Sequence, residues 1–500
     1  MDVINDVQAV SEPDVFQVII ERVCIGTLPL TSDDKEEIIM LLRCSVILLN
    51  FYFWQRDSTM TVICYKFRGE AIFIADLLQK AAPEAKTIFM YRNLPDFYDS
   101  VMNLDTPTLH DRSSSVFHTD MGESVPDPVT FLHNGAQFLV YSVDFDQRLL
   151  GLVKVQEGID IRKAPFVYQA QRENAEELLL LPFDVLPKVA DALTGTHATV
   201  KNIFLYNTGR CGSTLMCKCM DVINDVQAVS EPDVFQVIIE RVCTRNVPLT
   251  SDDKEEIIML LRCSVILLNF YFQQQDPSKR VICYKFRSEV IFIADLLQKA
   301  APEAKTIFMY RELPGFYDSY MNLLFNGSYW RYLFETTLRL DVLFRIPRTK
   351  TNYPILRFCV EHPRMITCPV THGMHFLFVS FWILQMQKAF DLIQEDSTTF
   401  FHTCLTFNQL MEHKERIVLK VLEKLDVDVS SDSDGSKITE IFGVDSQKGS
   451  AVQSERRKGN KIRSSWVGSW ERNLFSTVLG HFNGDVDEPD FIMPNTMAID

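Results

Sequence analysis

The stretch VKNIFLYNTGRCGSTL, residues 200–215, decides the fold that this sequence predicts. Val200 to Tyr206 is apolar and rich in residues that favour a β-strand. A short loop bracketed by Gly209 and Gly212 follows, and Leu215 to Val222 can continue as a helix. A strand, a glycine loop and a helix in this order form the first unit of an α/β fold.

The glycine loop has the composition of an anion-binding site. A loop between a strand and a helix directs backbone N–H groups and the positive end of the helix dipole at one point. Arg210 adds a positive charge, and Ser213 and Thr214 add hydroxyl donors. An ATPase of the Walker type needs a Lys where this loop has Gly212, so that class is disfavoured. The simpler alternative is a tight turn in which the glycines serve only chain reversal.

The chain after the loop predicts a parallel sheet covered on both faces, a P-loop type α/β fold. Ligands of such sheets bind at the carboxyl ends of the strands. Ser251 is the expected cap of the longest helix. The expected helices are 232–242, 251–272 and 288–300, and the expected strands are 281–284 and 306–310.

Other segments have a simpler pattern. Residues 137–155 alternate in polarity and predict a hairpin, while the polar stretch 106–128 predicts a linker. Residues 426–437 are expected to form a surface loop. Within it, residues 432–435 are interpreted as a turn, because Ser430 and Ile441 occupy positions at which a calcium loop needs acidic residues.

Most of one domain occurs twice in this sequence. Residues 1–104 repeat as 220–323 without a gap and with only fifteen substitutions. We therefore expect a truncated, catalytically silent duplicate over 1–104 that lacks the glycine loop, a linker over 105–129 and a complete P-loop domain over 130–500. The repeat is either a duplicated coding segment or an error in assembling the gene. The first copy keeps Glu12, Lys66, Arg92 and Ser100 as counterparts of Glu231, Lys285, Arg311 and Ser319.

Composition narrows the class of protein. A net charge of −16 argues against a nucleic-acid partner, because phosphate backbones need clustered Lys and Arg. The apolar stretches 257–272 and 375–386 are short for a membrane span, which predicts core helices and no stable membrane insertion. Without a recognisable signal peptide, we expect a cytoplasmic protein. The Cys and His residues between Cys359 and His375 match no standard zinc spacing, so no metal is expected.

Two elements of the sequence resemble the PAPS-dependent sulfotransferases, which use 3′-phosphoadenosine-5′-phosphosulfate (PAPS) as donor. The loop Thr208-Gly209-Arg210-Cys211-Gly212-Ser213-Thr214-Leu215 is similar to the family's 5′-phosphosulfate loop. Arg311 at a strand end and Ser319 eight residues later resemble the pair that holds the 3′-phosphate. Arg457-Lys458-Gly459 is similar to a basic loop over the 3′-phosphate, or is only a solvated turn.

The resemblance also implies catalytic roles. Arg210 stands where many cytosolic members carry a loop Lys, and it would neutralise charge at the phosphosulfate. Lys285 either approaches the sulfate or merely ends a strand, and two residues after it Arg287 replaces the family's catalytic His. Glu231, which follows the loop helix, is therefore the candidate general base, or it is only an N-terminal helix residue behind a Ser230 cap. The implied function is sulfuryl transfer to a hydroxyl or amine of a small-molecule or carbohydrate acceptor. The alternative is a non-catalytic nucleotide-binding protein of the same fold. Nothing in the sequence indicates an oligomeric state.

Overall fold

A computed structural model describes residues 7–11, 38–40, 42–43, 46, 62–66, 127–134, 137–194, 200–243, 248–325, 358–359, 361–368, 373–395, 400–429, 432–444 and 465–498. The chain divides into two compact units, Met1–Leu104 with Gly327–Leu377 and Asp105–Asn326 with Phe378–Asp500. The glycine loop lies in the second unit.

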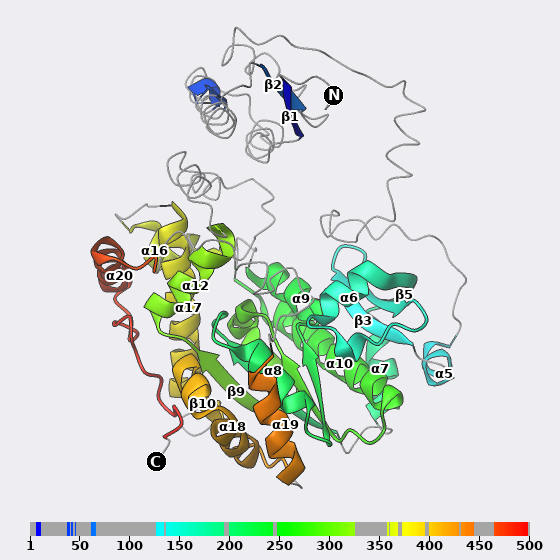
Figure 1. The fold of residues 1–500 in the computed structure, drawn as a ribbon. Helices are drawn as coiled ribbons and strands as arrows, with labels where there is room; N and C mark the ends of the chain where they lie inside the picture. The colour runs from blue at the N-terminus through cyan, green and yellow to red at the C-terminus, as the bar shows by residue number, and fades with distance from the viewer. Residues whose placement is uncertain are drawn as a thin grey trace, which may run out of the picture. The chain divides into compact units, whose positions relative to one another are not determined.

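The second unit is built on a five-stranded sheet in the order β10-β9-β6-β8-β7, and every pair of neighbouring strands is parallel. The expected parallel α/β sheet is confirmed (Figure 1). β6 lies in the centre, and the chain leaves it first for β7 and β8 on one side and later for β9 and β10 on the other. The loop after β6 therefore sits where the strand order reverses, which is where ligands of open α/β sheets bind. The strands are β6 (Lys201–Asn207), β7 (Val226–Ser230), β8 (Val281–Lys285), β9 (Lys305–Tyr310) and β10 (Thr403–Thr406).

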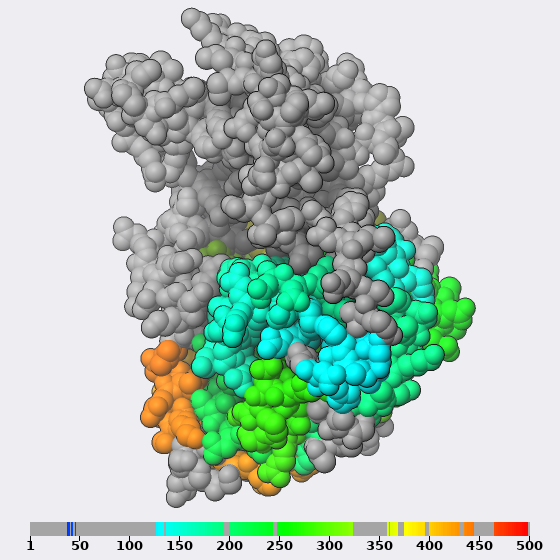
Figure 2. All heavy atoms as spheres, turned by 90° about the vertical axis from the view of Figure 1, so that its right-hand side faces the viewer, coloured from blue at the N-terminus to red at the C-terminus, as the bar shows by residue number. Residues whose placement is uncertain are grey.

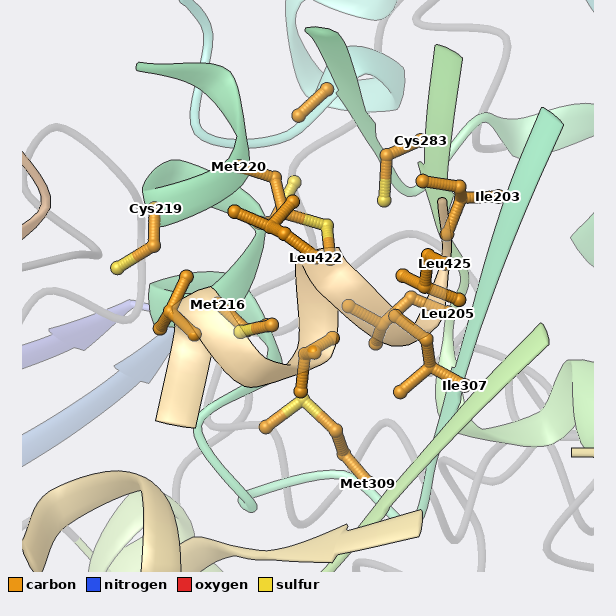
Figure 3. Close-up of a cluster of buried hydrophobic side chains, with 14 of the residues drawn as sticks. Ile203, Leu205, Met216, Cys219, Met220, Cys283, Ile307, Met309, Leu422 and Leu425 are labelled. Carbon is orange, nitrogen blue, oxygen red and sulfur yellow. The ribbon is translucent and has the colours of Figure 1, made fainter. Parts of the chain in front are cut away.

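Alternation along the strands gives the sheet two different faces. In β6, Ile203 and Leu205 belong to an aliphatic and sulfur-containing cluster, packed beneath helices on one face. Figure 3 shows these side chains converging with those of the helices after β6 and β10. The intervening Phe204 and Tyr206 point to the opposite face, where Phe286 contacts both rings. The first face is covered by α8 (Ser213–Asp221), α18 (Phe407–Lys424) and α19 (Asp432–Phe442).

Helices between the strands cover the aromatic face and the sheet edge. α20, which follows the last strand, adds Phe475 against the Tyr317 ring. The 3-10 helix η3 (Ser288–Ile293) leads directly into α11, so the helix expected over 288–300 is two elements. Thr250, not the predicted Ser251, caps α10 through a capping box with Asp253. These elements are α9 (Asp233–Cys243), α10 (Ser251–Gln275), α11 (Ala294–Ala300), α12 (Leu313–Phe325), α17 (Gly373–Glu395) and α20 (Ser469–Phe482).

An antiparallel sheet precedes the parallel one. The predicted hairpin is confirmed, and β5 pairs with its second strand to make the order β3-β4-β5. Figure 2 views the unit from this side, and the cyan residues lie directly against green ones of the second copy. The elements are α5 (Pro128–His133), β3 (Phe138–Asp144), β4 (Leu149–Val155), η2 (Ile161–Lys163), α6 (Val167–Asn174), β5 (Ala175–Pro182) and α7 (Leu186–Thr194).

Two local predictions are wrong. Residues 432–437 begin α19, although they were expected in a surface loop, and 432–435 are therefore helical rather than a turn. The helix packs on α8 through Ile438, which is buried in the aliphatic cluster. Burial of that apolar side chain outweighs the turn preference of the preceding Ser, Asp and Gly residues.

The two apolar stretches are helical, as expected. α17 is long and apolar enough to cross a membrane, but 83% of its most apolar window is buried inside the protein. This burial is typical of the core helix of a soluble protein.

In the first unit, β1 (Val7–Ser11) pairs in parallel with β2 (Val62–Lys66). Their register, from Val7↔Val62 to Ser11↔Lys66, is that of the corresponding β7 and β8. The predicted linker over 105–129 lies outside the described residues except for its last three, of which Pro128 and Val129 already belong to α5. Glu12, Arg92 and Ser100 also lie outside the described residues.

Candidate functional site

The loop after β6 has a backbone that only glycine adopts without strain at two positions. Gly209, Arg210 and Gly212 have φ angles of 77°, 54° and 80°. A Cβ on Gly209 would lie 2.8 Å from the Tyr320 hydroxyl, and one on Gly212 would lie 3.0 Å from a methyl of Leu410. Both glycines are therefore required by conformation and by space.

Asn207 fixes this loop to a neighbouring strand. Its side chain is buried, its Oδ1 accepts from the Gly209 N–H at 2.9 Å, and its Nδ2 donates to the Phe286 carbonyl at 2.8 Å. On the other side, the Thr208 N–H donates to the Met309 carbonyl at 3.0 Å. The loop is thus anchored to the residue that follows β8 and to β9 itself.

The start of α8 is arranged as an anion site would be. The N-cap residue is Gly212, which has no side chain to satisfy the first amides of the helix. Ser213 and Thr214 open the helix and are 5% and 7% exposed. Cys211 is fully buried, and its Sγ donates to the Met309 carbonyl at 3.4 Å. Burial raises the pKa of this thiol, so Cys211 can contact a ligand only through its backbone.

The structure brings the two predicted donor-binding elements together. Arg210 Nε donates to Ser319 Oγ at 2.9 Å, and Arg311 Nη1 donates to the Arg210 carbonyl at 3.4 Å. The Arg311 guanidinium also stacks over Phe407, 4.2 Å from the ring centroid. Arg210 therefore reaches the predicted 3′-phosphate residues from the predicted 5′-phosphosulfate loop.

Arg311 carries an unused donor. Burial lowers the pKa of this guanidinium, and its Nε has no hydrogen-bond partner among the described residues. Glu312 lies 3.9 Å from Nε, beyond hydrogen-bond distance. A buried, unsatisfied N–H on a cation costs free energy that an anionic ligand would recover.

Glu231 and Lys285 meet at the ends of β7 and β8. Lys285 Nζ forms an ion pair with Glu231 Oε1, and the Glu231 N–H donates to the Lys285 carbonyl at 2.7 Å. Glu231 has a left-handed φ of 55°, and Ser230 is the last residue of β7. The alternative in which Ser230 caps a helix is therefore wrong, since α9 begins at Asp233.

The ion pair continues into a network that the sequence did not predict. Arg287 lies 3.6 Å from Glu231 Oε2 and donates to Asp233 Oδ1 at 3.0 Å. Arg172 of α6 reaches the other oxygen of Asp233 at 2.5 Å and donates to the Tyr141 hydroxyl at 3.1 Å. Asp233 is 3% exposed. Because Arg172 belongs to a segment far away in sequence, only the tertiary fold reveals this contact.

Other sequence signals add nothing to this site. Arg457-Lys458-Gly459 lies outside the described residues. Within the part of the chain that the structure describes, no group of three or more His, Cys, Asp or Glu residues is placed to hold a metal ion.

No family model matches the sequence, and no curated protein is significantly similar to it. The resemblance to sulfotransferases therefore rests on the two sequence motifs and on the contacts between their residues in the structure.

Proposed function

We propose that this chain is a sulfotransferase-like enzyme that binds PAPS and transfers its sulfuryl group to a hydroxyl or amine acceptor. The observation that carries the proposal is the junction of Arg210, Ser319 and Arg311 beside a glycine loop that opens a helix. A donor that carries a 3′-phosphate and a 5′-phosphosulfate on one ribose needs cationic and hydroxyl groups at two adjacent places.

The residues fit such a donor. The amides of 210–214 and the α8 dipole suit the 5′-phosphosulfate, and the Arg311 Nε, which has no hydrogen-bond partner among the described residues, suits a phosphate oxygen. In the transfer, the acceptor oxygen or nitrogen forms a bond to sulfur. The bond from sulfur to the 5′-phosphate oxygen breaks, and adenosine 3′,5′-bisphosphate leaves with the electron pair. Arg210 would neutralise the charge that develops on this leaving group.

Glu231 is the proton acceptor that the resemblance implies, with Lys285 beside it. To accept a proton, Oε1 of Glu231 has to give up its contact with Lys285. Its other oxygen faces Arg287. Because both carboxylate oxygens of Glu231 already face cations, this arrangement favours the second candidate function, a nucleotide-binding protein of the same fold that performs no transfer.

Calorimetric titration with adenosine 3′,5′-bisphosphate tests both candidates together. Wild-type protein should bind, and Arg311→Gln should weaken binding by about tenfold or more because a charge-assisted hydrogen bond is lost. Arg262→Gln, at an exposed position on α10, is the matched control and should bind like the wild type. Absence of binding would contradict both functions.

Turnover separates the two candidates. PAPS is supplied with a panel of phenol, sugar and amine acceptors, and formation of adenosine 3′,5′-bisphosphate is followed. Turnover that Glu231→Gln reduces supports the enzyme with Glu231 as base, whereas tight binding without turnover supports the non-catalytic protein.

A further inference from the structure

Two hydroxyl groups converge on the first glycine of the loop. Tyr320 Oη lies 2.8 Å, and Ser288 Oγ 3.4 Å, from the position that a Cβ on Gly209 would take. Ser288 opens η3 just after β8, and Tyr320 lies in α12 just after β9. The two strands that flank β6 thus each lead to one hydroxyl at the loop.

These hydroxyls form a directed chain. Ser288 Oγ donates to Glu289 Oε2 at 3.2 Å, and Tyr320 and Ser288 are hydrogen-bonded to each other. A serine hydroxyl has one proton, so Ser288 can pass its proton to Glu289 only as it receives another, and Tyr320 is the neighbouring hydroxyl that can supply it. The chain therefore runs from the loop through Tyr320 and Ser288 to a carboxylate.

Packing holds the chain in place. The Tyr320 ring lies between Phe316 and Phe378, with centroid distances of 4.7 and 5.2 Å, and Ser288 is 7% exposed. Among the described residues, Glu289 forms no ion pair, in contrast to Glu231.

The two copies of the repeat differ at this chain. Ser288 and Tyr320 correspond to Gly69 and Val101 in the first copy, so the first copy has neither hydroxyl, although it keeps Glu70 at the position of Glu289. The loop sequence occurs once in the 500 residues and precedes the second copy. Both hydroxyl-bearing residues therefore occur in the copy that follows the glycine loop and are replaced in the copy without it.

We propose that Tyr320, Ser288 and Glu289, in place of Glu231, form a proton relay that takes the acceptor's proton during sulfuryl transfer, because both oxygens of Glu231 already face cations. The inference rests on the proposed function. The acceptor proton passes to Tyr320 Oη, the tyrosine proton to Ser288 Oγ and the serine proton to Glu289, while the acceptor atom bonds to sulfur and the bond to the 5′-phosphate oxygen breaks. Tyr320 is the catalytic residue that touches the acceptor.

The surroundings of Glu289 suit the role of terminal base. Burial raises the pKa of Glu289, which makes it a stronger proton acceptor than an ordinary glutamate. The charged and titratable groups that face it are Arg287 and Glu231 at the strand ends, Glu240 and Cys243 on α9, and Tyr320 on α12.

The test compares three variants of the full chain: Tyr320→Phe, Ser288→Ala and Glu289→Gln. Each should lower kcat for PAPS turnover, with water or the acceptor panel, by about 100-fold or more, because positioned proton transfer contributes that much. Affinity for adenosine 3′,5′-bisphosphate should change by less than about threefold, since the relay makes no donor contact. Ser288→Thr keeps the hydroxyl and should retain most of the activity.

Tyr271→Phe is the matched control. It removes a hydroxyl from a buried ring of α10 that contacts Phe272 instead of Gly209, and should leave kcat unchanged. Glu289→Gln should also abolish the acidic limb of the kcat profile against pH, which a merely structural role would not change.

The outcomes separate the relay from the proposed function. Turnover that survives Tyr320→Phe and Ser288→Ala overturns the relay and leaves the function standing. Nucleotide binding by wild-type protein without any turnover overturns the relay and supports the non-catalytic protein. No nucleotide binding by the wild type overturns both.

Discussion

The two halves of the candidate site both carry cationic side chains, but the fold satisfies the hydrogen bonds of one half and not those of the other. In the loop half, Arg311 keeps a buried N–H that has no hydrogen-bond partner among the described residues. In the ion-pair half, Lys285 and Glu231 satisfy each other, and the network continues to further charged side chains. The comparison teaches that a cluster of charges does not make a binding site. A binding site needs charged groups whose hydrogen bonds the fold leaves unsatisfied.

The largest expected effect is on the ion-pair half. Lys285→Met removes one partner of a buried pair, whose side chains are 4% and 15% exposed. The free energy of unfolding should fall by about 3 kcal/mol or more, because Glu231 would keep a buried charge with less compensation. Urea denaturation measures the change. The double variant with Glu231→Gln should recover part of it, and a fully additive loss would contradict the pairing.

Gly209→Ala tests the loop half. The left-handed backbone and the contact with the Tyr320 hydroxyl should together lower the free energy of unfolding by about 1–3 kcal/mol. Adding Tyr320→Phe removes the contact and should restore part of the loss in a double-mutant cycle. Gly480→Ala is the control, because nothing lies within 4 Å of its added Cβ in α20, and it should be neutral or stabilising.

Glu289 lies between the halves and should give a smaller, pH-dependent effect. Burial raises its pKa above the ordinary 4.5, so the folded chain holds this proton more tightly than the unfolded chain. Its contribution favours folding at low pH and is lost as the pH rises from 4.5 through the folded-state pKa. Glu289→Gln should flatten the dependence of unfolding free energy on pH in that window. An unchanged slope would show that Glu289 is not the group responsible.

An exposed ion pair should give the smallest effect. Arg262 and Asp191 lie 3.0 Å apart with side chains 55% and 66% exposed. Arg262→Ala should change the free energy of unfolding by less than about 0.5 kcal/mol, because solvent screens the pair. A loss of unfolding free energy as large as that of Lys285→Met would contradict the expectation that a buried ion pair contributes more to stability than an exposed one.

Much of the sheet could be predicted from local patterns. The strand, glycine loop and helix around Gly209 were expected, and so were β8, β9 and the hairpin of β3 and β4. β7 and β10 were missed. Both lie at the edges of the sheet. β10 has only four residues, and β7, although as long as β8, has the sequence VQAVS with only two bulky apolar residues, so neither gives a clear apolar run.

The candidate site was predicted only in part. Arg311 and Ser319 could be found because their spacing fits a strand end and a helix that starts beside it. Tyr320 and Ser288 were missed, since a single tyrosine in an apolar helix is usually a core residue. The differences between the two copies offered a signal, because Gly69 and Val101 replace these two hydroxyl-bearing residues.

The sequence by itself determined the sheet's hydrophobic faces and the loop that needs glycine, because alternation and backbone strain depend on neighbouring residues alone. Only the tertiary structure decided which charges are neutralised. It paired Lys285 with Glu231, brought Arg172 to Asp233 and, within the part of the chain that the structure describes, left the Nε of Arg311 without a hydrogen-bond partner. Electrostatic satisfaction depends on distances of a few ångströms between residues far apart in the chain, which local patterns do not encode.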